Sequence, residues 1–251
     1  MSQTHYSTNQ PGDSPNLRIL SSAQDAADAC AAYILSLLPR AVAEQQGATI
    51  AFSGGSTPKL LFAALAKADL DWKRVHFFWV DERCVPPTDS QSNYKLANDA
   101  FLAPAGIPES NIHRIYGELS PEAAADRYNS DIQTFFLLPS GKLPAFDVLH
   151  RGMGPDAHTA SLFPGEPLIK DRTGIAANVW VEKMQMHRIT LLPGVLLAAK
   201  NTILQVSGEE KADALQHVLR GPEDWLQYPC QIASRGKKAT WFLDRAVAQK
   251  L

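Results

Sequence analysis

Short apolar runs alternate with amphipathic stretches along most of the chain. Residues 48–52 form an apolar run suited to a buried strand, and a glycine-rich turn and a helical pattern over residues 59–67 follow it. A second unit of this kind has a strand over residues 75–80 and a helix over residues 92–102. The same patterns predict further strands at residues 112–115, 146–151, 179–183, 188–191, 202–206 and 239–242, and further helices at residues 23–46, 121–137, 195–199 and 209–220.

This alternation of elements predicts the fold class. Continuous apolar strands separated by helices are typical of an α/β fold with a largely parallel sheet and helices on both faces. No linker or internal repeat divides the sequence, so we predict one domain over residues 17–251, preceded by a disordered polar tail over residues 1–16. In sheets of this kind ligands bind beyond the carboxyl ends of the strands, so the turns that follow the strands are the expected place for a site.

Composition and charge exclude several classes of protein. The chain has 251 residues, 45% of them hydrophobic and 20% charged, which is the balance of an ordinary globular protein. Because 24 Lys and Arg residues nearly balance 26 Asp and Glu residues, we expect no nucleic-acid or membrane partner, and any anion must be bound locally. The three cysteines are far apart, and no signal-peptide pattern, metal-ligand spacing or bilayer-long apolar run is found. These features predict a cytoplasmic protein without a metal.

The first candidate turn has the sequence Ser53-Gly54-Gly55-Ser56-Thr57-Pro58 and joins a strand to a helix. Its two glycines allow the backbone to approach a ligand closely. We expect Thr57 to be the N-cap of the helix and Pro58 its first residue. Free amides at a helix start form a site for an anion, most often a phosphate, although a tight turn that needs glycine for geometry alone is the alternative.

The second candidate turn directly follows the apolar strand at residues 75–80 and consists of three charged residues, Asp81, Glu82 and Arg83. Packing does not explain charges at the end of so apolar a strand. Arg83 can clamp a phosphate with two N–H donors, and an acid can orient the arginine or polarise a water molecule. Asn93 opens the next helix and adds a polar group to the same rim. A surface cluster of salt bridges is the alternative.

Asp156 and His158 lie two residues apart in the turn that follows the strand at residues 146–151. A carboxylate at this spacing can orient or charge the imidazole, which gives and takes protons near neutral pH. A purely structural histidine is the alternative.

Lys211 follows the strand at residues 202–206, in the first turn of a predicted helix whose start carries a capping box from Ser207 to Glu210. A cation is disfavoured at a helix N-terminus, and a bound anion would reverse that penalty. A solvent-exposed lysine paired with a glutamate is the alternative. Together the four turns describe a phosphorylated substrate with proton-transfer chemistry at its other end.

These residues resemble the 6-phosphogluconolactonase family from about residue 20 to the C-terminus. The motifs that carry the resemblance are SGGSTP at 53–58, VDERCVP at 80–86 with SNY at 92–94, GMGPDAHTASLFPG at 152–165, RITL at 188–191 and GEEKA at 208–212. The resemblance implies a fold like that of glucosamine-6-phosphate deaminase and ribose-5-phosphate isomerase, a modified Rossmann-type three-layer α/β/α sandwich. It also implies hydrolysis of 6-phospho-D-glucono-1,5-lactone to 6-phosphogluconate in the oxidative pentose phosphate pathway, with no metal, organic cofactor or obligate protein partner.

The resemblance also implies a role for each matching residue. His158 would be the acid/base group and Asp156 would orient it, so that a water molecule attacks the lactone carbonyl and a proton reaches the departing ring oxygen. The residues implied to bind the 6-phosphate or the sugar are Gly54, Gly55, Ser56, Thr57, Asp81, Arg83, Asn93, Arg188 and Lys211.

Three positions depart from the usual pattern of the family. His150 and Arg151 replace a pair of leucines before the GMG motif, and Ala157 replaces a glycine. An alanine costs about 1 kcal/mol where the backbone needs a positive φ, and it could turn His158 away from its water. Because a buried unpaired charge is costly, we expect Arg151 to point into the cleft or to meet an acid such as Asp81 or Glu82.

Two other functions remain as alternatives. The first is a sugar-phosphate isomerase or deaminase on the same scaffold, with Asp81 as the base that removes a proton next to the carbonyl. The second is a catalytically impaired sugar-phosphate sensor, which the three departures suggest. The arginine after Asp81-Glu82 and the HTASLFPG run favour the lactonase over the deaminase.

Overall fold

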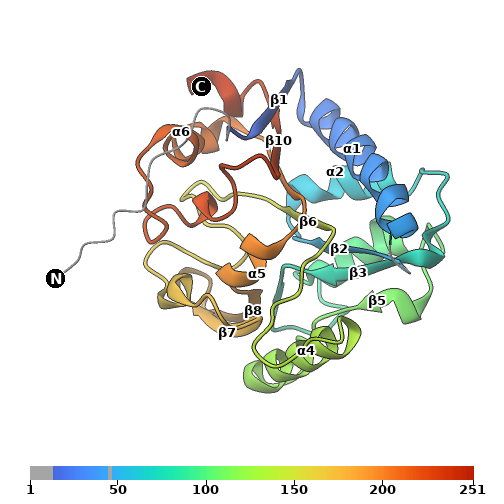
Figure 1. The fold of residues 1–251 in the computed structure, drawn as a ribbon. Coiled ribbons are helices and arrows are strands. Elements are labelled where there is room, and N and C mark those ends of the chain that lie inside the picture. The colour runs from blue at the N-terminus through green and yellow to red at the C-terminus, as the bar shows by residue number, and fades with distance from the viewer. Residues whose placement is uncertain (1–13, 45–46) are drawn as a thin grey trace.

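The computed structural model describes residues 14–44 and 47–251 (Figure 1). The predicted tail over residues 1–16 therefore lies largely outside the described residues. Its last residue belongs to a strand that the sequence patterns did not predict, β1 (Asn16–Leu20). This strand lies at one edge of the sheet, and the side chains of Leu17 and Ile19 are 40% and 50% exposed. A half-exposed edge strand lacks the continuous apolar run by which the buried strands were found.

The centre of the molecule is a sheet of seven strands in which every neighbouring pair is parallel. The strand order is β1-β10-β9-β6-β2-β3-β5. Its other members are β2 (Ala48–Phe52), β3 (Val75–Trp79), β5 (Ile112–His113), β6 (Val148–Arg151), β9 (Thr202–Val206) and β10 (Ala239–Asp244). The parallel sheet expected from the apolar runs is confirmed.

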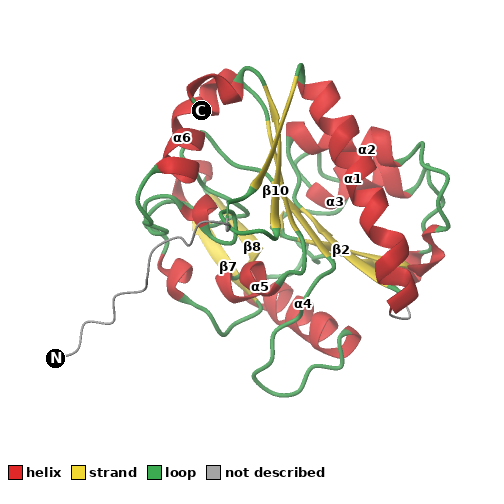
Figure 2. Cartoon of the chain, turned by 45° about the horizontal axis from the view of Figure 1, so that its top comes forward, coloured by secondary structure: helices red, strands yellow, loops and turns green. Residues whose placement is uncertain are grey.

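Helices cover both faces of this sheet, which gives three layers (Figure 2). One face carries α1 (Ala23–Glu44) and α2 (Ser56–Leu65), which contact each other, and α3 (Asn93–Ala97) follows beside α2. The other face carries α4 (Pro121–Phe135) and α5 (Pro193–Ala198). The last helix, α6 (Ala212–Arg220), packs close to the C-terminus of the chain. The three-layer α/β/α prediction is therefore confirmed.

A second, antiparallel sheet lies on the same side as α4 and has the order β4-β8-β7. Its strands are β4 (Asp81–Arg83), β7 (Ala176–Val181) and β8 (Met186–Leu191). The prediction of a turn at residues 81–83 is thus wrong, because these residues pair with β8. A three-residue strand of charged side chains carries no hydrophobic period, and its partner is distant in the sequence, so no local pattern could reveal it.

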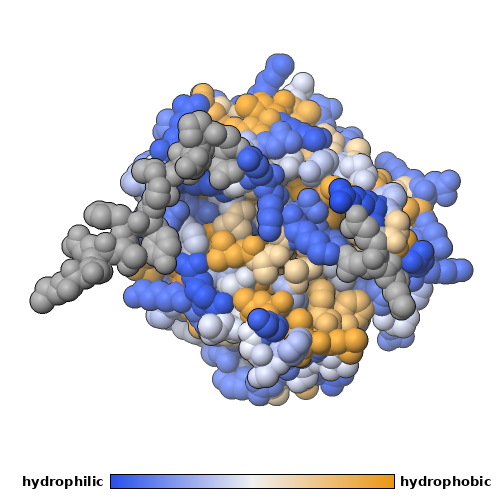
Figure 3. Space-filling view, in the orientation of Figure 1, coloured by the Kyte–Doolittle hydropathy of each residue, from blue (hydrophilic) through white to orange (hydrophobic). Residues whose placement is uncertain are grey.

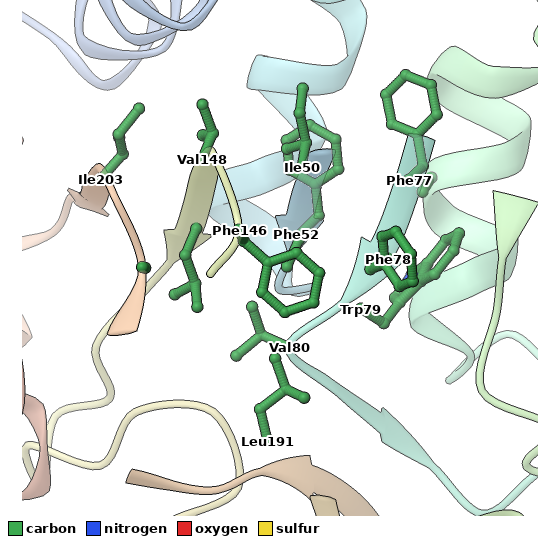
Figure 4. Packing of buried hydrophobic residues seen from close by; sticks show 14 of the residues in the cluster. Ile50, Phe52, Phe77, Phe78, Trp79, Val80, Phe146, Val148, Leu191 and Ile203 are labelled. Carbon is green, nitrogen blue, oxygen red and sulfur yellow. The ribbon is translucent and has the colours of Figure 1, made fainter. Parts of the chain in front are cut away.

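The main core is rich in aromatic side chains from β2 and β3 (Figure 4). Phe52 and Phe77 stack with ring centroids 6.2 Å apart, and Trp79 is 1% exposed. Where the two sheets join, the Leu191 amide donates to the Val80 carbonyl at 2.8 Å, and both side chains are buried. This packing fixes the strand ends from which the candidate turns depart.

Helix α1 is long and apolar enough, by length and composition, to cross a membrane. Its apolar stripe is nevertheless buried in the core, since Cys30, Ile34 and Leu38 are all fully buried and the helix contacts β10, β9 and β1. We therefore interpret α1 as a core helix, as its amphipathic pattern predicts. Over the face drawn in Figure 3, hydrophilic and hydrophobic side chains are interspersed.

Candidate active site

The four candidate turns meet in one cleft of about 270 Å³ beyond the carboxyl ends of the strands. The predicted residues that line it are Gly54, Gly55, Thr57, Asp81, Arg83, Asn93, His158, Arg188 and Lys211. Of the remaining predicted residues, Ser56 is the first residue of α2, and Asp156 lies behind His158 in an adjacent groove. The topology thus brings turns from four distant parts of the sequence to one edge of the sheet, as expected for this class of fold.

The glycine-rich turn delivers the N-terminus of α2 to the cleft. The helix begins at Ser56 and its N-cap is Gly55, so the predictions of Thr57 as the N-cap and Pro58 as the first helical residue are wrong. Gly55 has a φ of 112°, which L side chains rarely adopt, and no side chain caps the helix. The first amides of α2 are therefore left for a ligand, which is the arrangement of a phosphate site.

Gly54 allows the turn to pack against the start of α3. A Cβ atom at this position would lie 1.8 Å from Oδ1 of Asn93, so no larger residue fits there without displacing Asn93. The Nδ2 atom of Asn93 donates to the Asp81 carbonyl at 2.8 Å, and its Oδ1 accepts from Arg83. Glycine at 54 is thus needed for close approach, while glycine at 55 is needed for its backbone conformation.

The three charges of β4 alternate between two sides of the strand. Asp81 and Arg83 face the cleft, whereas Glu82 is buried and caps the start of α3. Its carboxylate accepts from the backbone amides of Asn93 and Tyr94, both at 2.7 Å, and from the Ser92 hydroxyl. Burial raises the pKa of Glu82, and these hydrogen bonds partly counter that effect. Glu82 therefore holds the start of α3 in place and does not line the cleft.

Arg83 and Arg188 lie directly opposite each other in the β4–β8 pairing. Like charges at such positions repel unless an anion lies between them. One Arg83 nitrogen donates to Oδ1 of Asn93 and to the Gln91 carbonyl, both at 2.6 Å, and it meets no carboxylate in the described chain. Arg188 lies 3.9 Å from an oxygen of Asp81, and burial lowers its pKa while Asp81 raises it. The pair is a candidate anion site. The sequence patterns indicated the two arginines separately and did not predict that they lie opposite each other.

Lys211 follows the end of β9 and adds a third cationic side chain to the lining of the cleft. The capping box predicted from Ser207 to Glu210 is wrong: Gly208, with φ 103°, caps a short 3-10 turn, and the Ser207 hydroxyl has no hydrogen-bond partner among the described residues. Lys211 itself is the N-cap of α6. Burial lowers the pKa of Lys211, whereas Glu210 and Asp244 raise it.

His158 lines the same cleft. Its Nδ1 lies 2.5 Å from Oδ1 of Asp156, and the other carboxylate oxygen accepts from Lys183 at 2.7 Å. Burial raises the pKa of Asp156, but the hydrogen bonds from His158 and Lys183 outweigh it and hold the pKa well below its usual range. An ionised Asp156 can only accept, so Nδ1 carries the proton and Nε2 of the neutral ring is left to accept one. The ring also stacks on Phe163 at 4.2 Å.

Ala157 does adopt the positive φ that glycine would favour, with φ 63°. The turn keeps its shape because the Ala157 amide donates to the Gly154 carbonyl at 3.0 Å and its carbonyl accepts from the Cys230 amide at 2.9 Å. His158 still lines the cleft and still bonds to Asp156. The alanine therefore does not turn the imidazole away.

The prediction that Arg151 points into the cleft or meets an acid is wrong. Its side chain is fully buried and donates to the Thr159 hydroxyl at 3.0 Å and to the Ile232 carbonyl. Thr159 in turn donates to the Gly152 carbonyl at 2.9 Å. The guanidinium thus donates to uncharged acceptors, and its contact with Thr159 helps to hold the turn of residues 152–159 in place. Burial lowers the pKa of Arg151.

The sequence model of the family described as Glucosamine-6-phosphate isomerases/6-phosphogluconolactonase matches residues 21–242. The chain belongs to this family. A 6-phosphogluconolactonase from Synechocystis is 34% identical over 240 residues, which cover 94% of this chain and 98% of the relative. A 6-phosphogluconolactonase from Nostoc is 40% identical over 221 residues, or 87% of this chain and 90% of the relative.

A solved structure agrees with the family assignment. The 6-phosphogluconolactonase from Trypanosoma cruzi has a TM-score of 0.86 and 25% sequence identity, and the match covers 97% of this chain and 99% of that chain.

Within the described residues, no group of three or more His, Cys, Asp or Glu side chains could hold a metal ion.

Sequence reasoning missed three residues that the structure places in the cleft of this family member. Lys183 reaches Asp156, Phe163 packs under His158, and Gln205 lies on the floor at the end of β9. A glutamine in an otherwise apolar strand was a usable signal for Gln205. Lys183 lies in the short 3-10 turn between β7 and β8, and only the folding of that hairpin over the cleft brings it to Asp156.

His150 should make the fold sensitive to acid. Burial lowers its pKa to about 4 in the folded chain, whereas the unfolded residue takes up a proton near its ordinary value of 6.5. The unfolded state then binds more protons between these values, so the free energy of unfolding falls as the pH drops through this window, by about 3 kcal/mol in total. Urea unfolding at pH 6.5 and 4.5 should show a smaller decrease for His150→Leu. Equal decreases in both proteins would contradict this assignment.

Proposed function

We propose that the chain hydrolyses 6-phospho-D-glucono-1,5-lactone to 6-phospho-D-gluconate. The observation that carries the proposal is that one cleft is lined both by a candidate anion site and by His158, which bonds to an ionised Asp156. A substrate that carries both a phosphate and a reactive carbonyl fits these two sets of residues. The identity of 34–40% to the two 6-phosphogluconolactonases, over most of their length, supports the same reaction.

The anion site would hold the 6-phosphate. The first amides of α2, reached through Gly54 and Gly55, would donate to its oxygens, as amides at helix N-termini do. Arg83 and Lys211 would add charge-assisted hydrogen bonds, and Arg188 would lie near the sugar. Bound phosphate would also relieve the repulsion between Arg83 and Arg188. Binding energy at this end would fix the position of the carbonyl at the other end.

His158 would act as the general base. Its Nε2 would take a proton from a water molecule as the water oxygen attacks the lactone carbonyl carbon, and donors of the cleft would stabilise the oxyanion. Collapse of the tetrahedral intermediate breaks the bond to the ring oxygen, and the proton on His158 passes to that oxygen as it leaves. Asp156 would stabilise the transient imidazolium, and Lys183 would keep Asp156 ionised and in place.

We further propose that the reaction needs no cofactor and takes place in the cytoplasm. None of these steps requires redox or Lewis-acid chemistry, since a lactone is already an activated ester. A 6-phosphogluconolactonase from Arabidopsis, 37% identical over 224 residues, is named chloroplastic, and this chain covers 67% of its length.

The decisive test is the hydrolysis of freshly generated lactone, followed by proton release against the spontaneous rate. Acceleration by the purified chain is the expected result. Ammonia release from glucosamine 6-phosphate would support the deaminase alternative instead. Binding of 6-phosphogluconate without turnover would support the sensor, and Ala157→Gly would then show whether a glycine at this position restores activity.

A further inference from the structure

The floor of the cleft carries a buried amide with unused donors. Gln205 is 1% exposed, lies one residue before the end of β9 and lines the cleft. Its Nε2 has no hydrogen-bond partner in the described part of the chain. Buried amides are nearly always hydrogen-bonded, so an amide nitrogen without a partner, on a residue that lines a cleft, indicates that a ligand supplies the acceptor.

His150 fixes the direction of this amide. Its Nε2 lies 3.3 Å from Oε1 of Gln205, and the imidazole is fully buried beside Phe52, with ring centroids 5.8 Å apart. A neutral imidazole can donate from Nε2 to the amide oxygen, and this leaves the amide nitrogen as the end of the side chain without a partner among the described residues. The pair replaces apolar packing at the end of two buried strands, which costs stability and therefore calls for a functional reason.

Gln205 lines the same cleft as the proposed phosphate ligands and His158. Strand β9 leads to Lys211 and neighbours β6, which leads to His158, and β6 also neighbours β2, which leads to the glycine-rich turn. The Ser53 hydroxyl lies at the end of β2, lines the same cleft and also lacks a partner among the residues described. The proposed substrate carries hydroxyl groups on the carbons between its phosphate and its carbonyl, so a sugar bound in this cleft presents hydroxyl oxygens to the residues that line it.

We propose that Gln205 binds the substrate by donating from Nε2 to a hydroxyl oxygen of the sugar, and that His150 is the positioning residue that holds the amide in this direction. The inference rests on the proposed function, which supplies the polyhydroxylated substrate. It assigns to this chain a specificity-determining pair, because a ligand without that hydroxyl would leave the amide buried and unpaired.

The experiment compares wild type, Gln205→Leu, His150→Leu and the double variant on the full lactone and on its 2-deoxy, 3-deoxy and 4-deoxy analogues. Gln205→Leu should lose about tenfold in kcat/KM on the full substrate, mainly through KM, with an unchanged pH profile of kcat. On the analogue that lacks the recognised hydroxyl, wild type and Gln205→Leu should be equal. His150→Leu should lose less, and the double variant should match Gln205→Leu because both changes remove one interaction.

A structural role predicts a different pattern. The ratio of wild-type to Gln205→Leu activity would then be the same for all four substrates, and that result, or a ratio within twofold of one on the full lactone, overturns the proposal. The double variant is the control for misfolding, since it restores an apolar pair, and melting temperatures are recorded for all four proteins.

If wild type does not open the lactone, the proposed function fails separately from this proposal. The binding of 6-phosphogluconate is then measured by calorimetric titration instead. Weaker binding by Gln205→Leu supports the pair, and equal binding refutes it.

Discussion

His158→Asn should lower kcat for lactone opening by about a hundredfold to ten-thousandfold, the range typical of removing a general base. Asparagine can still donate to Asp156 and fill part of the space against Phe163, but it cannot take up a proton. KM should change little, because the proposed phosphate ligands are other residues and stay in place. Initial rates of proton release, corrected for spontaneous hydrolysis, measure both parameters.

The matched control for this substitution is His217→Asn. His217 is also a partly exposed histidine stacked on an aromatic ring, in this case Tyr228 at 5.3 Å, but it lies on α6 outside the catalytic cleft. We expect wild-type rates from it. Retention of more than a third of wild-type kcat by His158→Asn would remove His158 from the mechanism, whatever the control shows.

The parts of the fold that the sequence predicted correctly are those with a local physical signature. The strands β2 and β9 are buried at every residue, and this burial requires the mainly apolar runs by which they were predicted. The turns that follow them converge because parallel strands end at one edge of the sheet. By contrast, β1 is half exposed and β4 is charged, so neither carries the apolar pattern that identifies a strand.

Side-chain direction was the harder quantity to predict. Glu82 and Arg83 are adjacent in the sequence, yet the first caps α3 and the second lines the cleft, because β4 alternates its side chains between two sides. Arg151 was expected to need an acid, but its two terminal nitrogens donate to the hydroxyl of Thr159, eight residues along the chain, and to the Ile232 carbonyl, which is distant in the sequence. In both cases the deciding contact is made by tertiary packing, which local spacing does not encode.

The backbone of the catalytic turn leads to the second large effect, which we expect from Gly154→Ala. A Cβ atom at residue 154 would lie 2.1 Å from both Cε1 and Nδ1 of His158 and 2.8 Å from Oδ1 of Asp156. The backbone cannot easily yield, because the Gly154 amide donates to the His158 carbonyl at 3.0 Å. The methyl group should therefore expel the imidazole from its bond with Asp156, lower kcat/KM about a hundredfold or more, and cost about 1–3 kcal/mol of stability.

A glycine in the same turn provides the control. A Cβ atom at Gly152 would meet no atom closer than the Gln205 carbonyl at 3.7 Å, an ordinary contact, so Gly152→Ala should lose far less activity. The double variant Gly154→Ala/His158→Ala should regain part of the stability that Gly154→Ala loses, since the ring that the methyl group strikes is gone. Wild-type-like rates for Gly154→Ala would mean that His158 acts from another position, because the observed Asp156–His158 contact and a side chain at residue 154 cannot coexist.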